Sequence, residues 1–230
     1  MLKSILVLMA VAYVSADLPA GRSLAAPDVQ LCQRRSIHEL GPDGKGYFFS
    51  WRDPALATAQ YDWLDARNYC RRQCMETISL ETSVENEWIK ERLVKDKVRL
   101  VSGSDTRGLV KLGLQVKYIW TSGRKCDFKG CDRPDLLPNE VNGWFWTATL
   151  EKLAPATQRD QNDWSPTGGI GKPQPDNREP QQGGAEENCL AVLNQFYNDG
   201  VHWHDVACHH VKPFVCEENP ELARLVPFIH

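Results

Sequence analysis

The chain has 230 residues, of which 42% are hydrophobic and 25% are charged, a composition typical of a globular protein with a buried core. Its formal net charge of −3 gives no electrostatic reason to expect nucleic acid or an anionic membrane surface as a partner. The length allows one or two domains.

Residues 1–16 have the pattern of a secretory signal peptide. Lys3 precedes an unbroken apolar run from Ile5 to Val14, and small residues then predict cleavage after Ala16. This run is too short to span a bilayer, and no later apolar run approaches the length of a membrane span. We therefore expect a secreted, extracellular protein with no membrane span.

All eight cysteines follow the predicted signal peptide. An even number in a secreted chain predicts a disulfide framework, although about a hundred pairings are possible before any other argument. The short separation of Cys126 and Cys131 suits a local disulfide loop, because two further ligands for a zinc knuckle are not found nearby.

Residues 17–44 read as a polar N-terminal extension broken by proline and glycine. The aromatic stretch from Gly46 to Trp51 predicts the first strand. A helix is predicted from Asp62 to Gln73, because its apolar residues recur on one face.

Thr82 and Glu85 form a capping box ahead of a second helix, predicted from Ser83 to Val94. Val84, Trp88 and Leu93 are expected to face the core. The sequence from there to Val116 is weakly patterned, and no element is predicted in it.

Two further strands are predicted at Lys117–Gly123 and Gly143–Thr147. Residues 150–187 contain many Pro, Gly, Asn and Gln residues and little periodicity. A loop of this length inside a compact domain is usually functional. Beyond it, Cys189–Leu193 and Val201–Cys208 predict an antiparallel hairpin. A last strand is predicted from Lys212 to Glu217, followed by a tail at residues 218–230.

Oxygen-bearing side chains are concentrated between Gln174 and Cys208. Asp176, Glu187 and Asp205 supply three carboxylates in this stretch, which contains Cys189 and ends at Cys208. Ca²⁺ prefers several oxygen ligands, mostly anionic, and a disulfide can stiffen the loop that carries them.

These residues also resemble a known family. Gln174-Pro175-Asp176, a Glu two residues before Cys189, and Trp203-His204-Asp205 are similar to the calcium site of the C-type lectin-like domain. The pattern of the predicted helix at Asp62–Gln73 and the Trp144-Phe145-Trp146 sequence of the predicted strand add to the resemblance. It implies an α+β, C-type lectin-like fold at residues 45–217, with two helices, antiparallel sheets, disulfides and a long irregular ligand-binding loop.

The resemblance implies two disulfides, Cys70–Cys216 and Cys189–Cys208. Proximity suggests Cys126–Cys131, and the remaining pair is Cys32–Cys74.

The resemblance also implies that Gln174, Asp176, Glu187 and Asp205 bind Ca²⁺, and that carbohydrate contacts these four residues and His204. A cis peptide before Pro175 would turn the flanking side chains toward one point. The family usually has Asn in place of His204. Imidazole nitrogen is a poor ligand for a hard cation, so we expect weaker calcium binding. The amide-proline-acid order resembles members that prefer galactose-type sugars.

The function implied is extracellular carbohydrate binding assisted by Ca²⁺, as in secreted arthropod members. The glycans would be recognised in immunity or belong to the extracellular matrix or cuticle, including matrix polysaccharide. An alternative is a calcium-independent lectin-like domain that binds a protein or matrix partner. We do not expect an enzyme, because no Gly-X-Ser-X-Gly motif is present and the cysteines are all assigned to disulfides.

A transition-metal site is a further alternative. His202 and His204 lie two residues apart on one predicted strand face, and His209 and His210 follow Cys208.

Overall fold

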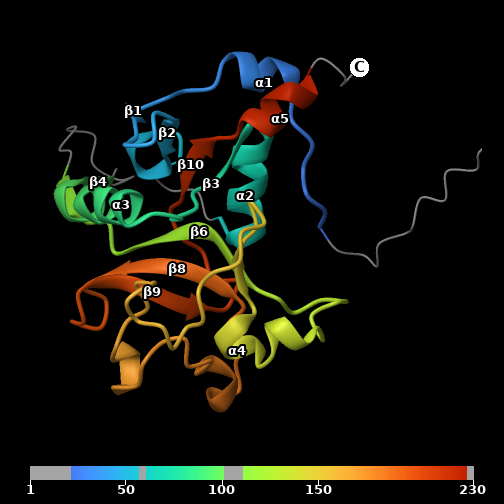
Figure 1. Cartoon of the computed structure of the whole chain (residues 1–230). Coiled ribbons are helices and arrows are strands. Elements are labelled where there is room, and N and C mark those ends of the chain that lie inside the picture. Colours follow the sequence, from blue (N-terminus) through green and yellow to red (C-terminus); the bar gives the residue numbers. More distant parts are fainter. Residues whose placement is uncertain (1–21, 57–60, 101–110, 227–230) are drawn as a thin grey trace, which may run out of the picture.

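The computed structural model describes residues 22–56, 61–100 and 111–226, so the predicted signal peptide lies outside the described residues. Within these ranges, no helix is long and apolar enough to cross a membrane. The described chain is a mixed α+β structure built on antiparallel sheets (Figure 1).

The first sheet has the strand order β1-β2-β10-β3. Its strands are β1 (Glu39–Leu40), β2 (Gly46–Phe49), β10 (Val215–Glu218) and β3 (Met75–Thr77). The expected N-terminal extension therefore contributes β1, which pairs antiparallel with β2. The extension also contains the short helix α1 (Val29–Gln33). The aromatic run of β2 is shorter than predicted, because the 3-10 helix η1 (Ser50–Arg52) follows it.

The second sheet has the order β7-β6-β8-β9. Its strands are β7 (Trp144–Trp146), β6 (Tyr118–Lys125), β8 (Cys189–Asn194) and β9 (Val201–Val206). The predicted hairpin is confirmed, because β8 and β9 pair antiparallel along their whole length. Two short helical segments, η2 (Pro134–Leu136) and α4 (Asn139–Asn142), lie between β6 and β7.

Both predicted helices are present as α2 (Trp63–Arg72) and α3 (Ser83–Lys95). The capping box is formed: the Thr82 hydroxyl accepts from the Glu85 N–H at 3.2 Å, and the Glu85 carboxylate accepts from the Thr82 N–H at 3.0 Å. Leu93 is buried, but the prediction for Val84 is wrong, since it is 62% exposed. The buried stripe of α3 contains Glu85, Ile89 and Leu93 at four-residue spacing, which turns Val84 outward.

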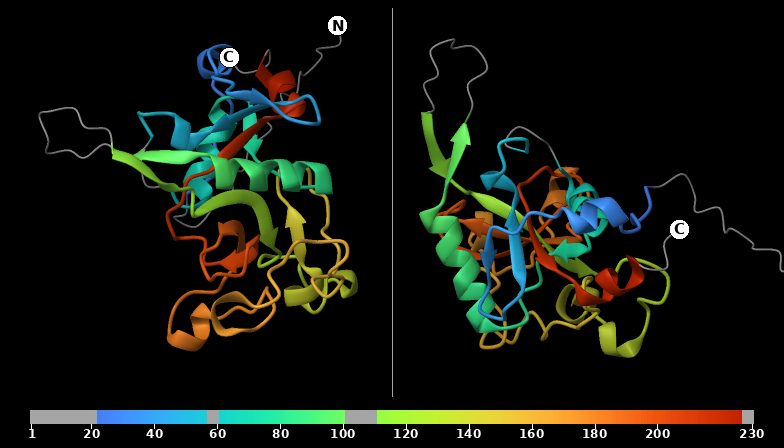
Figure 2. Two further views of the ribbon diagram at one scale, coloured as in Figure 1. Left: turned by 90° about the vertical axis from the view of Figure 1, so that its left-hand side faces the viewer. Right: turned by 90° about the horizontal axis from the view of Figure 1, so that it is seen from above.

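An antiparallel ribbon and a C-terminal helix are among the elements that were not predicted. β4 (Lys97–Leu100) and β5 (Lys111–Gln115) form an antiparallel ribbon in the weakly patterned region, and this ribbon runs outward from the body (Figure 2). The expected C-terminal tail contains the helix α5 (Pro220–Leu225). Its Leu222 packs on a disulfide at the end of α2.

The structure contains four disulfides, and they are the four pairs expected from the sequence: Cys32–Cys74, Cys70–Cys216, Cys126–Cys131 and Cys189–Cys208. Cys70–Cys216 joins α2 to β10, across 146 residues of sequence. Cys189–Cys208 ties the first residue of β8 to the chain just after β9, which fixes the hairpin at the end nearest the long loop.

Tryptophan side chains attach the long loop to the core. Trp164, in the middle of the loop, packs edge-on against Trp144 and Trp203, with ring centroids 4.8 and 6.0 Å apart. Trp203 is also buried against Trp146. Burial of large aromatic surfaces of this kind stabilises a segment that has little secondary structure of its own.

Candidate functional site

The long irregular loop lies at the far end of the molecule from α1 and α5, and its orange segments are below β8 and β9 in Figure 1. It contains two 3-10 helices, η3 (Gly168–Ile170) and η4 (Glu179–Gln182). Backbone hydrogen bonds attach it to the edge of the second sheet, because Ser165 N–H donates to Trp203 O at 3.0 Å. Gln174 N–H then donates to Ser165 O at 2.8 Å, which brings the Gln-Pro-Asp stretch toward β9.

The peptide between Gln174 and Pro175 is cis, as the sequence analysis hypothesised. Beyond it, two successive backbone N–H groups donate to the carboxylate of Asp205 in β9. Asp176 N lies 3.1 Å from Oδ1, and Asn177 N lies 2.7 Å from Oδ2. The Asp205 side chain thus holds the loop against the strand.

Asn177 closes the far end of the loop, a role that the sequence analysis did not assign. Its Oδ1 accepts from Glu187 N–H at 2.9 Å, and its Nδ2 donates to the Glu186 carboxylate at 2.6 Å. In return, the Glu187 carboxylate accepts from Arg178 N–H. Asn177 has a φ of 44°, which asparagine tolerates better than most residues. The sequence signal that could have indicated this role is the position of Asn177 directly after Pro175-Asp176.

Three carboxylates meet at this point. One oxygen from each of Asp176, Glu187 and Asp205 lies within 4.8 Å of the others. Asp205 is 4% exposed, and Oδ2 of Asp176 is buried without a hydrogen-bond partner. Among the described residues, none of the three forms an ion pair with a basic side chain.

Burial and, to a smaller extent, the negative charge of a neighbouring carboxylate raise the pKa values of Asp205 and Glu187. Burial raises the pKa of Asp205 to about 7, with a further contribution from the negative charge of Glu187, while the two backbone N–H donors oppose the rise. Burial also raises the pKa of Glu187, and the charge of Asp176 acts in the same direction. Such a group fits a hard divalent cation, which would neutralise the repulsion and satisfy the buried oxygen.

The fourth predicted ligand, Gln174, is 4% exposed and lines the same cavity as the carboxylates. Its amide packs so closely on Gly168 that a Cβ at that glycine would be 2.3 Å from Nε2. A cavity of about 430 Å³ opens beside these residues. Its lining includes Gln174, Asp176, Glu187, Asp205, His204, Tyr118, Phe196, Tyr197 and Lys212.

His204 belongs to a separate buried contact. Its Nε2 lies 3.0 Å from Oδ2 of Asp199, although the angles are not those of a hydrogen bond, and both side chains are 2% exposed. Burial lowers the pKa of His204 to about 4, so the imidazole is neutral at physiological pH. The ring forms part of the cavity wall and gives no oxygen to the carboxylate group.

The transition-metal alternative at His202 and His204 of β9 does not receive a suitable geometry. His202 Nδ1 lies 2.8 Å from Oδ1 of Asp163, so His202 and His204 contact different carboxylates. The structure does not bring these two imidazoles to a shared metal position.

No protein-family model matches the chain, and a comparison with curated proteins gives no match. Among solved structures, the chain is similar to the carbohydrate-recognition domains of the scavenger receptor C-type lectins of mouse and human. The mouse domain has a TM-score of 0.44 and 18% identity, over 76% of this chain and 90% of that domain. The human domain has a TM-score of 0.43 and 22% identity, over 76% and 91%.

A Ca²⁺-dependent type II antifreeze protein, in its Ca²⁺-free form, is similar at a TM-score of 0.43 and 17% identity, over 77% of this chain and 94% of that one. All three likenesses are distant. The α+β fold class with antiparallel sheets, few helices and four disulfides is confirmed by the described structure itself.

Proposed function

We propose that the chain is a secreted C-type lectin-like protein that binds carbohydrate at a Ca²⁺ site formed by Asp176, Glu187 and Asp205. The observation that carries the proposal is the convergence of three carboxylates within 4.8 Å of one another beside an open cavity. Asp176 and Glu187 lie on the long loop, and Asp205 lies in β9. The Cys189–Cys208 disulfide and the packing of Trp164 on Trp203 hold these segments together.

The carboxylates satisfy most of what a calcium ion requires. Ca²⁺ takes six to eight oxygen ligands, and three acidic side chains with the carbonyl oxygen of Gln174 supply four or more, depending on whether each carboxylate is monodentate or bidentate. When bound, the ion would leave coordination positions that two neighbouring sugar hydroxyls could complete. The ligand carboxylates would also accept hydrogen bonds from those hydroxyls.

The cavity wall supplies the apolar half of a sugar site. Tyr197 and Phe196 are 42% and 48% exposed, and their rings pack edge-on at 4.8 Å. Tyr118, next to Phe196, lines the same cavity. Aromatic rings beside convergent polar groups are typical of small-ligand sites. The Gln-Pro-Asp order favours galactose-type sugars, and the source of the glycan would be a microbial surface or the extracellular matrix or cuticle.

A calcium-independent lectin-like protein is the second candidate. The observation that favours it is that both oxygens of Asp205 already accept backbone N–H groups, while His204 offers no oxygen. In that protein, the carboxylates would only brace the loop, and the cavity would take a protein or matrix ligand.

A glycan array separates the two candidates. The mature chain is applied in CaCl₂ and again in EDTA, together with Glu187→Gln and, as a matched control, Asp160→Asn, which changes an exposed acid on the same loop. The calcium site predicts glycan binding that EDTA and Glu187→Gln abolish and Asp160→Asn preserves. Glycan binding that is equal in EDTA, or no glycan binding at all, would favour the second candidate.

A further inference from the structure

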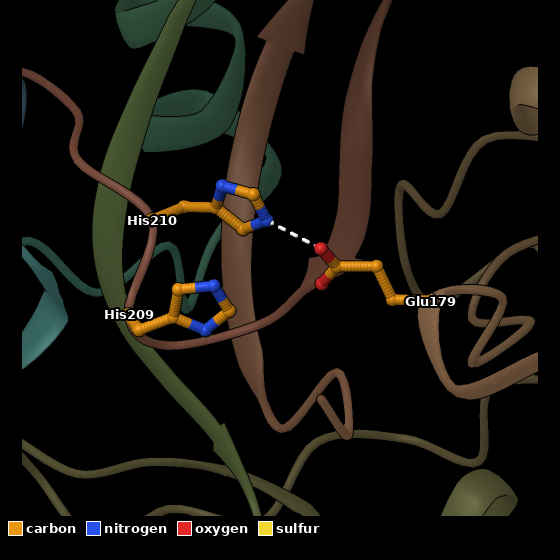
Figure 3. A group of neighbouring side chains, drawn as sticks. All are labelled: Glu179, His209 and His210. Carbon is orange, nitrogen blue, oxygen red and sulfur yellow. Dashed lines mark hydrogen bonds and ion pairs between the residues drawn. The ribbon is translucent and has the colours of Figure 1, made fainter. Parts of the chain in front are cut away.

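A second group of potential metal-binding side chains lies beside the same cavity, whose lining includes Glu179 and His210. Glu179 of η4 faces His209 and His210, which follow β9 (Figure 3). One potential ligand atom from each residue lies within 4.8 Å of the others. His210 Nε2 is 2.7 Å from Oε1 of Glu179, so the imidazole and the carboxylate already point at each other.

The backbone fixes the two histidines where they are. The Cys189–Cys208 disulfide holds the residue immediately before His209. A turn follows, in which His210 N–H donates to Ala207 O at 3.1 Å. Consecutive side chains of an extended strand would point to opposite faces, but in this turn the two rings stack, with centroids 4.7 Å apart.

The backbone also fixes the carboxylate. Glu187 accepts from the N–H of Arg178, directly before Glu179, and Gly184 N–H donates to Glu179 O at 2.9 Å. The loop therefore presents Glu179 at a defined place on the cavity wall rather than on a freely moving segment.

One oxygen of this carboxylate lacks a partner. Oε2 of Glu179 is buried and accepts no hydrogen bond, while Oε1 is occupied by His210. Leaving a buried carboxylate oxygen unsatisfied is costly, so its retention calls for an explanation. Lys212 lines the same cavity, but its ammonium group lies over the Tyr118 ring, 4.5 Å from the centroid.

We propose that Glu179, His209 and His210 bind a borderline divalent metal ion such as Zn²⁺. Two imidazole nitrogens and one carboxylate oxygen are the donor set that Zn²⁺ accepts readily and that Ca²⁺ does not. The site differs in chemistry from the Asp176 group, where every donor is oxygen.

Small movements suffice to form the site. Tetrahedral zinc with bonds of about 2.0–2.1 Å places neighbouring ligand atoms roughly 3.3 Å apart. The His210–Glu179 contact must therefore open slightly, and the exposed ring of His209 must turn inward. Three protein ligands leave a fourth position for water or for a donor atom of a ligand in the cavity.

The bound metal would join the long loop to the segment after β9. Glu179 is three residues beyond Asp176, so the cross-link would reduce the motion of the proposed calcium ligands. The zinc site does not depend on the proposed function, because none of its three ligands belongs to the calcium group.

The test uses the mature full chain without a histidine tag, treated with EDTA and titrated with Zn²⁺ by calorimetry. We expect one zinc ion per chain. Glu179→Gln, His209→Gln and His210→Gln should each weaken binding by at least about tenfold, because each removes a ligand. His202→Gln is the matched control, since it removes another β9-region imidazole, one that contacts Asp163 instead.

Visible absorption of Co²⁺ in the same variants gives a second readout that reports coordination rather than folding. Intense bands are expected in the wild type and in His202→Gln, and weak bands in the other three variants. Asp176→Asn should lower calcium affinity and leave zinc binding unchanged, which separates the two proposals. The zinc site is wrong if the wild type takes up no zinc, or if His210→Gln and His202→Gln bind it equally.

Discussion

Replacing Asp205 with asparagine tests whether the three carboxylates form a strained anionic group. In the absence of metal, the pKa of Asp205 is raised from 3.8 to about 7 by burial and by the charge of Glu187. The folded state therefore holds the proton more tightly than the unfolded state does. The resulting stabilisation is fully present below pH 3.8 and is lost as the pH rises through about 7.

The amount of folding stability that is lost follows from the pKa shift of Asp205. A rise from 3.8 to about 7 corresponds to roughly 4 kcal/mol, of which about 2–3 kcal/mol is lost between pH 5 and pH 8. The asparagine side chain does not titrate, so Asp205→Asn should gain about 2–3 kcal/mol relative to the wild type over this range. The amide can leave one of the two backbone N–H donors without an acceptor, which adds a cost that is independent of pH.

The assay is urea unfolding at pH 5, 6, 7 and 8 in EDTA, followed by tryptophan fluorescence with the disulfides intact. The stability difference between variant and wild type should move in favour of the variant as the pH rises. Asp160→Asn, on the same loop, should run parallel to the wild type. Parallel curves for Asp205→Asn as well, or a difference that grows against the variant, would refute the reasoning.

Three further predictions concern binding and folding. Because protons compete with Ca²⁺ for Asp205 and Glu187, the calcium affinity measured by calorimetry should fall by about tenfold per unit as the pH drops below 7, and a flat profile would contradict this. Thr82→Ala removes the capping box of α3 and should cost about 1 kcal/mol in urea unfolding; no change would show that the cap is redundant. Replacing Cys32 and Cys74 together with serine should cost up to about 4 kcal/mol, read as a lower Tm, and an unchanged Tm would show that the extension is held by packing alone.

Local sequence signals predicted the elements that carry their own pattern. The Thr82–Glu85 capping box located α3 to within one residue of its end, and the apolar face of Trp63–Arg72 located α2. Lys97–Leu100 and Lys111–Gln115 also alternate polar and apolar residues, but over so few positions that the alternation does not stand out. Short strands of this kind are fixed by their pairing, which a local pattern does not contain.

The part of the candidate site that could be predicted is the set of carboxylates that the resemblance to the C-type lectin-like calcium site implied. Asp176, Glu187 and Asp205 were selected together, and the structure places them together. The burial of His204 against Asp199 was not predicted, because it depends on a loop tip folding back over β9.

The contact of Glu179 with His209 and His210 was also not predicted, because it too depends on how the chain folds. It joins segments that are 30 residues apart, and only the folded loop and the disulfide bring them into contact. Sequence spacing alone favoured His202 and His204, which contact different carboxylates in the structure.

Calorimetric titration of the EDTA-treated mature chain with Ca²⁺ at pH 7.5, in parallel with Glu187→Gln, tests the proposed calcium site most directly. We predict one binding site in the wild type, with a dissociation constant on the order of 10⁻⁵ to 10⁻³ M, and no measurable site in Glu187→Gln. Absence of binding in the wild type, or equal binding by the variant, would mean that the three carboxylates do not form a calcium site.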